Sequence, residues 1–170
     1  MIRFRRYIPF WTILFTLLAL DQVTKLATLA WIPSSYENPP IEVIPGFFNL
    51  VHVYNKGAAF SMFSGHRWPL VILALGALIG IFFWRRSLEL ERPIVQWAFG
   101  LLTGGIIGNV IDRVFYGHVV DFLDFNIPLY GHWPAFNIAD SGICIGVGLY
   151  VVYSFMRPVK KEKKPEEAAA

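Results

Sequence analysis

Residues 136–156 read FNIADSGICIGVGLYVVYSFM. Asp140 is the only charged residue in this stretch, and the apolar run after it approaches the roughly 20 residues that an α-helix needs to cross a bilayer. Gly142, Gly146 and Gly148 are small enough to let a second helix approach closely. A carboxylate at the edge of such a run is costly at the hydrocarbon boundary, so it usually has a function. The stretch therefore predicts a membrane-spanning helix with a functional aspartate at its beginning.

The composition of the whole chain is that of an integral membrane protein. Its 170 residues are 55% hydrophobic and 16% charged, with a mean hydropathy of +0.49, whereas about a quarter of the residues of a soluble domain are charged. There is one cysteine, Cys144, and the four histidines are scattered, so we expect no disulfide, no metal site and no cofactor. The net charge of +3 comes from Lys and Arg residues beside apolar stretches, which indicates membrane topology rather than a nucleic-acid partner.

Four apolar stretches predict a membrane all-α fold with four transmembrane helices. The first stretch carries Asp21 and Lys25 and has no small-residue cleavage site, which argues against a removable signal peptide. We expect a single membrane domain over residues 1–157 and a disordered charged tail over 158–170. The expected helices span about residues 8–32, 69–84, 94–112 and 138–156, with outer loops at 33–67 and 114–136.

The positive charges predict which side of the membrane each loop faces. Most of the 15 Lys and Arg residues lie in the N-terminal segment, in the loop between the second and third helices, or in the tail. Because positively charged loops stay in the cytoplasm, we expect both termini to be cytoplasmic. The two longer loops then face the opposite side.

The first of these outer loops predicts a small β-rich unit, a cradle, between the first two helices. Residues 41–44 and 47–54 are rich in β-branched and aromatic side chains, and Pro45-Gly46 separates them. This pattern is typical of a hairpin of two strands. Its aromatic side chains suit the headgroup level of a bilayer, so membrane lipid is an expected partner.

A second aspartate, Asp121, lies in the apolar segment VVDF at residues 119–122. If the third and fourth helices are antiparallel neighbours, Asp121 and Asp140 approach one another. Two close carboxylates can share a single proton. One can then activate a water while the other donates a hydrogen bond to a peptide carbonyl, as in aspartic proteases. The polar residues expected around them are Asn109, Asp112, Arg113 and Asn137.

Spacing alone leaves other roles open for these residues. Asp140 could serve only as the N-cap of its helix, and Asp112, beside Arg113, could be an ion-pair member or a cap partner. Asp124 follows Asp121 by three residues and is a rival for the carboxylate pair. The whole chain could also be a small transporter with a relay of charged residues, or a membrane anchor whose glycine-rich helices dock a partner.

Five segments of the sequence resemble lipoprotein signal peptidase (signal peptidase II), a family of bacterial intramembrane aspartyl proteases. They occur in the family's order and are spread over the chain up to the charged tail. The segments are DQVTK at 21–25, NKGAAFS at 55–61, GGIIGNVIDR at 104–113, VVDF at 119–122 and FNIADS at 136–141.

The resemblance implies four helices with both ends in the cytoplasm, in agreement with the charge pattern. It also implies that Asp121 and Asp140, and not Asp124, form the catalytic pair. Asp21 and Lys25 match a first-helix pair of the family, which could be a structural bridge or a direct contact to substrate. The polar positions that the family places around the catalytic pair are Asn55, Asn109, Arg113 and Asn137.

The resemblance further implies the substrate and the location. The family removes the signal peptide of diacylglyceryl-modified prolipoproteins by cleaving before the lipidated cysteine, and the peptide antibiotic globomycin inhibits it. We therefore expect a monomeric multi-pass enzyme of the bacterial cytoplasmic (inner) membrane, with its active site near the outer, periplasmic face.

Overall fold

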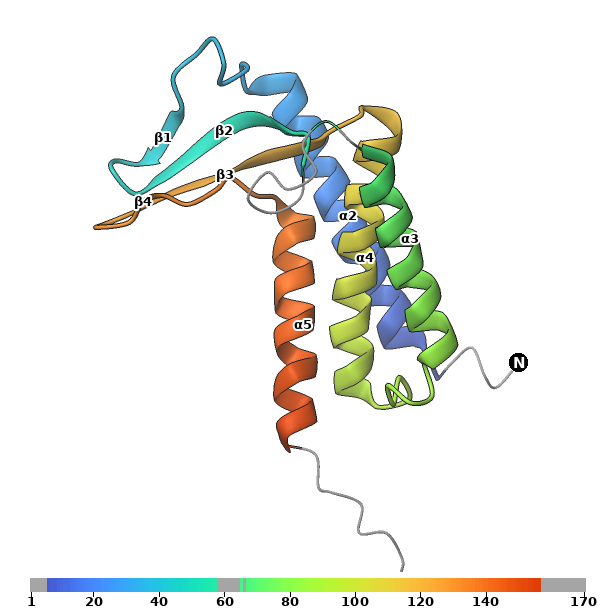
Figure 1. Cartoon of the computed structure of the whole chain (residues 1–170). Helices are drawn as coiled ribbons and strands as arrows, with labels where there is room; N and C mark the ends of the chain where they lie inside the picture. The colour runs from blue at the N-terminus through green and yellow to red at the C-terminus, as the bar shows by residue number, and fades with distance from the viewer. Residues whose placement is uncertain (1–5, 58–64, 66, 157–170) are drawn as a thin grey trace, which may run out of the picture.

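The computed structural model describes residues 6–57, 65 and 67–156. Four helices and four strands alternate in groups along this part of the chain (Figure 1). The expected tail at 158–170 and most of the expected NKGAAFS motif, from residue 58 on, lie outside the described residues. The helices are α2 (Ile8–Trp31), α3 (Arg67–Trp84), α4 (Pro93–Phe115) and α5 (Ile138–Met156), and the strands are β1 (Ile41–Ile44), β2 (Phe48–Asn55), β3 (Val119–Ile127) and β4 (Gly131–His132).

The four helices confirm the four predicted spans. They contain 24, 18, 23 and 19 residues, and each is long and apolar enough to cross a membrane. The helix α4 begins at Pro93 and continues to Phe115, three residues beyond the predicted end. Proline fits the first turn of a helix because its missing N–H is not needed there. A cation such as Arg113 in the last turn interacts favourably with the helix dipole, so this charge does not end the helix.

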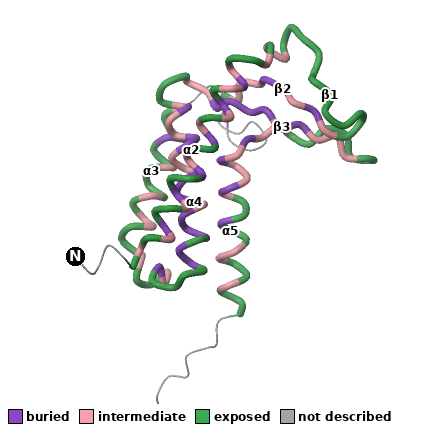
Figure 2. The backbone as a smooth tube through the Cα atoms, turned by 180° about the vertical axis from the view of Figure 1, so that it is seen from behind, coloured by how far each residue is buried: buried purple, intermediate pink, exposed green. Residues whose placement is uncertain are grey.

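The helix α4 forms the centre of the bundle. More than half of its apolar window is buried inside the protein, against about a fifth or less for each of the other three helices. Figure 2 shows the buried residues concentrated along α4, with exposed residues along the outer faces of α3 and α5. A Cβ atom at Gly105 would collide with the backbone carbonyl of Ala139 in α5, and one at Gly108 would collide with the carboxylate of Asp21 in α2.

Close packing was predicted for the glycines of the last helix. It is confirmed for Gly142, which lies against Leu17 of α2, and for Gly146, which lies against the backbone of α4 at Ala98. It is wrong for Gly148, where a Cβ atom would meet nothing within 4 Å.

The four strands form one antiparallel sheet in the order β1-β2-β3-β4. The predicted hairpin over 41–44 and 47–54 is confirmed by β1 and β2. The prediction of β structure in the first outer loop alone is wrong, because β3 and β4 come from the second outer loop. The signal was present in residues 119–127, VVDFLDFNI, which are rich in β-branched and aromatic side chains. Only the pairing of β2 with β3 shows that the two loops share a sheet.

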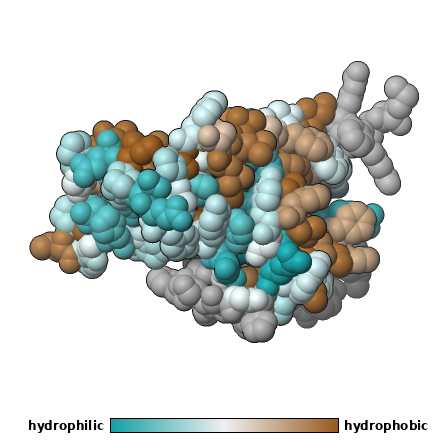
Figure 3. All heavy atoms as spheres, turned by 90° about the horizontal axis from the view of Figure 1, so that it is seen from above, coloured by the Kyte–Doolittle hydropathy of each residue, from teal (hydrophilic) through white to brown (hydrophobic). Residues whose placement is uncertain are grey.

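The sheet lies across one end of the helical bundle, which we call the sheet end (Figure 1). The start of α2 and the end of α5 both lie at the opposite end. Viewed onto the sheet end, hydrophilic residues cover much of the face and hydrophobic residues lie toward its margins (Figure 3). Because Val53 pairs with Asp121 and Asn55 with Val119, the sheet register brings polar residues of both strands to the ends of the helices.

Candidate active site

A cavity of about 1080 Å³ lies at the sheet end, between the sheet and the helices α4 and α5. It brings together five of the residues singled out from the sequence, although these residues come from four different elements. Asn137 lies directly behind the cavity and is fully buried. The five residues in the cavity wall are Asn55, Asn109, Arg113, Asp121 and Asp140.

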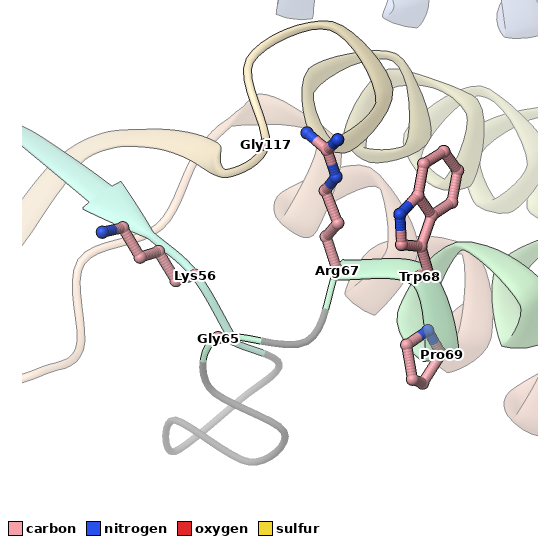
Figure 4. A pocket seen from close by; sticks show the side chains of 6 residues that line it. All are labelled: Lys56, Gly65, Arg67, Trp68, Pro69 and Gly117. Carbon is pink, nitrogen blue, oxygen red and sulfur yellow. The ribbon is translucent and has the colours of Figure 1, made fainter.

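A second, smaller cavity of about 250 Å³ lies beside the start of α3 (Figure 4). The guanidinium of Arg67 lies over the Trp68 ring, 5.0 Å from its centroid, and points toward Gly117. Gly117 has a φ of +80°, which favours glycine at this turn, and a Cβ atom there would lie 3.0 Å from Arg67 Nη1. No carboxylate is among the described residues that line this cavity. The candidate active site is therefore the larger cavity.

Asp121 is held in β3 with only 1% of its surface exposed. Its Oδ2 atom accepts a 2.8 Å hydrogen bond from Asn55 Nδ2, and its Oδ1 atom accepts a 2.7 Å hydrogen bond from Asn137 Nδ2. The pKa of Asp121 is raised to about 7, first by burial and then by the negative charge of Asp140, while the two amide donors oppose the rise. This carboxyl group can therefore hold a proton close to neutral pH.

Asp140 lies in the first turn of α5 and takes part in a capping box with Asn137. The side chain of Asn137 accepts the backbone N–H of Asp140 at 2.9 Å, and the carboxylate of Asp140 accepts the backbone N–H of Asn137 at 3.2 Å. The alternative that Asp140 is the N-cap is therefore wrong, because Asn137 occupies that position. The other oxygen of Asp140, Oδ1, accepts a 2.8 Å hydrogen bond from Asn109 Nδ2.

Asn137 joins the two aspartates. It caps the helix that carries Asp140, and its Nδ2 atom donates to Asp121 across the start of α5. The same amide lies 3.3 Å from the carbonyl oxygen of Val120 and 3.4 Å from Asn109 Oδ1. One buried amide thus fixes β3, α4 and α5 relative to one another at the cavity.

Arg113 lines the cavity without pairing with its neighbour in sequence. Its guanidinium donates hydrogen bonds to the carbonyl oxygens of Gly57 at 2.9 Å and Asn109 at 3.3 Å. The suggested pair of Asp112 with Arg113 is wrong, because Asp112 instead lies 2.9 Å from Lys25 Nζ. Consecutive residues of a helix point in different directions, so Asp112 faces α2 while Arg113 faces the cavity.

Asp21 and Lys25 do not line the cavity, among the residues that the structure describes there. They form an i,i+4 ion pair of 2.9 Å that is almost completely buried between α2 and α4. The structure thus places this pair where a structural bridge would lie. Sequence reasoning missed Gln22, whose Nε2 atom donates to Asp21 and Asp112 at 3.1 Å each. Its position beside Asp21 in the DQVTK segment was the available signal.

Asp124, the rival aspartate, lies in a different environment. It accepts a 2.8 Å hydrogen bond from Asn49 Nδ2 and lies 3.0 Å from His132 Nδ1. It is not among the described residues that line the larger cavity. Within residues 6–57, 65 and 67–156, no three His, Cys, Asp or Glu residues are grouped so as to hold a metal ion. Among the described residues that line the larger cavity, Asp121 and Asp140 are the two that carry carboxyl groups, and they lie beside amides and the guanidinium of Arg113.

Comparisons with known proteins agree on one family. The profile of the family described as Signal peptidase (SPase) II matches residues 13–156. The lipoprotein signal peptidase of Aeromonas hydrophila is 45% identical over 150 residues, which are 86% of this chain and 87% of that protein. That of Janthinobacterium sp. (strain Marseille) is also 45% identical, over 91% of this chain and 92% of its own. A solved bacterial membrane enzyme, determined by the in meso method at 2.3 Å resolution, is similar with a TM-score of 0.78 and 36% identity, over 90% of this chain and 92% of that one.

Proposed function

This chain belongs to the signal peptidase II family, and from that premise we propose that it is an aspartic endopeptidase whose catalytic pair is Asp121 and Asp140. Its relatives are named lipoprotein signal peptidases, so the proposed substrates are prolipoproteins. The proposed reaction removes the signal peptide from diacylglyceryl-modified prolipoproteins by cleavage before the lipidated cysteine. The observation that carries the proposal is the presence of two carboxyl groups in one cavity, one of them with a pKa near 7.

In the proposed mechanism Asp121 holds the shared proton and Asp140 is the carboxylate. Asp140 takes a proton from a water molecule, whose oxygen attacks the carbonyl carbon of the scissile peptide bond. Asp121 donates its proton to the carbonyl oxygen, so that a neutral tetrahedral diol forms without an acyl-enzyme. Asp140 then gives its proton to the departing nitrogen as the C–N bond breaks, and one diol hydroxyl returns a proton to Asp121. The products are the carboxyl end of the signal peptide and the free amino group of the cysteine.

The amides and the guanidinium position the reacting groups in this proposal. Asn55 and Asn137 orient the carboxyl group of Asp121, and Asn109 orients that of Asp140. Arg113 lies in the same cavity wall and can stabilise negative charge that develops on the carbonyl oxygen. These donors are already in place before substrate binds, which lowers the reorganisation needed in the transition state.

The position of the cavity suits a lipid-modified substrate. Its wall continues from the sheet to Ser141, Ile143 and Cys144 of α5, which are residues of a membrane-spanning helix. The acyl chains of the substrate can therefore remain in the bilayer while the peptide bond reaches the carboxyl groups. Globomycin, as a peptide inhibitor of the family, would occupy the same cavity. The proposed location is the bacterial inner membrane, with the sheet end on the periplasmic side and the monomer as the active unit.

Three substitutions test this proposal. Asp121→Asn and Asp140→Asn should each lower cleavage of a purified diacylglyceryl-modified prolipoprotein by about 10²-fold or more, the size expected when a general acid or base is lost. Asp124→Asn is the matched control, because it removes a buried carboxylate of the same sheet that does not line the cavity. It should keep most of the activity, and EDTA should not inhibit the wild-type enzyme.

Folding of each variant is checked by circular dichroism and by its melting temperature. Near-normal cleavage by a folded Asp121→Asn or Asp140→Asn protein would rule out the proposed pair. Complete inactivity of a folded Asp124→Asn protein would mean that the pair has been assigned wrongly.

A further inference from the structure

One buried lysine joins the segments that carry the two proposed catalytic aspartates. Lys25 Nζ lies 2.9 Å from the carboxylate of Asp21 and 2.9 Å from that of Asp112, and it donates a 3.0 Å hydrogen bond to Asn109 Oδ1. The three charged side chains are each no more than 3% exposed. None of the three is among the described residues that line the larger cavity, so they are not placed to touch a substrate there.

The first arm of this cluster reaches the start of α5. Asp21 Oδ1 accepts a 2.9 Å hydrogen bond from the backbone N–H of Ala139, the residue before Asp140. Asn109 gives a second connection, because its side chain accepts from Lys25 and donates to Asp140 Oδ1. The backbone beside Asp140 is therefore connected to Lys25 through Asp21, and the carboxylate of Asp140 is connected to Lys25 through Asn109.

The second arm reaches β3. Asp112 Oδ2 accepts a 3.2 Å hydrogen bond from the backbone N–H of Val120, the residue before Asp121. Gln22 closes the cluster by donating from one amide nitrogen to both Asp21 and Asp112. The same lysine thus holds the backbone next to each of the two proposed catalytic residues.

We propose that Asp21, Lys25 and Asp112 are positioning residues that set the relative placement of Asp121 and Asp140. We call these three side chains the ion frame. The inference rests on the proposed function, since it assigns to the frame the task of aligning the proposed catalytic pair. Anchoring the helices to one another would not require these charged side chains to converge on the backbone N–H groups of Ala139 and Val120. The proposed positioning role explains this convergence.

Burial makes the ion frame rigid. A buried charge that loses its partner is strongly unfavourable, so neither carboxylate can move away from Lys25 without a large cost in free energy. Hydrogen bonds that involve a charged group are also shorter and stronger than neutral ones. The fit at Gly108 adds to this, because a Cβ atom there would collide with the carboxylate of Asp21. The backbone N–H groups of Ala139 in α5 and Val120 in β3 are therefore hydrogen-bonded to carboxylates of the rigid ion frame.

The frame also acts on the pair through its charge. The positive charge of Lys25 opposes the rise in the pKa of Asp121 that burial and Asp140 cause. The other charged side chains near the pair are Asp21 from α2, Asp112 and Arg113 from α4, and Lys56, which directly follows β2. Loss of Lys25 should therefore shift the basic limb of the pH–rate profile to higher pH, in addition to any loss of alignment.

The experiment measures kcat, KM and the pH–rate profile of frame variants of the full-length enzyme in detergent micelles. Asp112→Asn is the main variant, because it leaves the Asp21–Lys25 pair intact and should fold. We expect kcat to fall at least tenfold and KM to change less than threefold, since no frame residue lines the cavity. Lys25→Met should lower kcat further and move the basic limb to higher pH. Arg6→Met is the matched control, because it removes a cation from the exposed ion pair with Glu91 at the opposite end of the bundle, and it should leave kcat unchanged.

A neutral triple variant, Asp21→Asn/Lys25→Met/Asp112→Asn, guards against loss of folding, because it leaves no unpaired charge in the frame. If the frame only stabilises the fold, any frame variant with the wild-type melting temperature will have wild-type kcat and an unchanged pH profile, and the inference is overturned. If such a variant is folded and slow with an unchanged KM, the inference holds. Failure of the proposed function gives a different result, namely activity in Asp121→Asn or Asp140→Asn.

Discussion

At the scale of single residues, the environment of Asp121 suits its proposed role as a proton donor. Its carboxyl group is only 1% exposed, and burial favours the neutral form and raises the pKa. The amides of Asn55 and Asn137 donate hydrogen bonds to its oxygens, which favours the ionised form and limits the rise. The balance gives a pKa of about 7. A group with this pKa can donate a proton near neutral pH and take it back within one catalytic cycle.

The pH dependence of kcat/KM follows from this pKa, because kcat/KM reports the protonation of the free enzyme. Asp121 starts from an ordinary value of 3.8 and is raised to about 7, so it keeps its proton up to neutral pH and loses it above. If Asp121 must be protonated, kcat/KM should fall as pH rises through about 7, close to tenfold for each further pH unit. The measurement is the rate of cleavage at substrate concentrations well below KM between pH 5 and 9. A rate that stays constant from pH 6 to pH 9 would contradict a protonated Asp121.

At the scale of secondary-structure elements, the site depends on how closely α4 approaches its neighbours. Gly105 lies against the backbone of α5 at Ala139, one residue before Asp140. The capping box of Asn137 starts α5 at the same level. The contact of Gly105 in α4 with the backbone of α5 at Ala139 therefore determines how far the carboxylate of Asp140 extends into the cavity.

The substitution Gly105→Ala tests this contact. The added methyl group meets a backbone carbonyl that cannot rotate away, so α5 must shift. We expect a loss of about 1–3 kcal/mol in stability, the usual cost of overpacking, and a fall in kcat because Asp140 moves relative to Asn109. Gly76→Ala is the control, since a Cβ atom at Gly76 in α3 meets nothing within 4 Å. Equal melting temperatures and activities for the two variants would show that the approach of α4 and α5 does not set the site.

At the scale of the whole molecule, four spans place the beginning of α2 and the end of α5 at one end of the bundle and the sheet at the other. Positive charges lie near both chain termini and in the loop between α3 and α4. They favour a cytoplasmic location for the end of the bundle that holds the beginning of α2 and the end of α5. The charged residues of the proposed site gather at the sheet end instead of following the length of the bundle, which is unlike a relay for transport. The sheet end is therefore the proposed periplasmic face.

Cysteine labelling tests this orientation. In a Cys144→Ala background, Glu42→Cys in β1 should react with a membrane-impermeant maleimide in intact spheroplasts, because this exposed residue lies on the sheet. Arg86→Cys, in the loop between α3 and α4, should react only after the membrane is permeabilised. The reverse pattern would invert the proposed topology and place the active site in the cytoplasm.

Much of the architecture could be predicted from local sequence. The four spans follow from runs of apolar residues, and the β1–β2 hairpin follows from two β-branched and aromatic segments around Pro45-Gly46. The meeting of Asn109, Asp121 and Asp140 could also be anticipated, because Asn109 and Asp140 lie toward neighbouring ends of two antiparallel helices and Asp121 lies in the segment that joins them. For the spans and the hairpin the physical cause, burial of apolar surface in lipid or in a hairpin, acts over a short stretch of chain.

The remaining features depend on contacts between residues far apart in the chain. The pairing of β2 with β3, the choice of Lys25 over Arg113 as partner of Asp112, and the placement of Asp124 outside the cavity were decided by the packing of helices and strands. A buried polar group is stable only beside a partner, and which partner is available depends on helix rotation and strand register. Apolar patterning selects the elements of this protein, and tertiary packing determines which charges meet at its proposed catalytic pair.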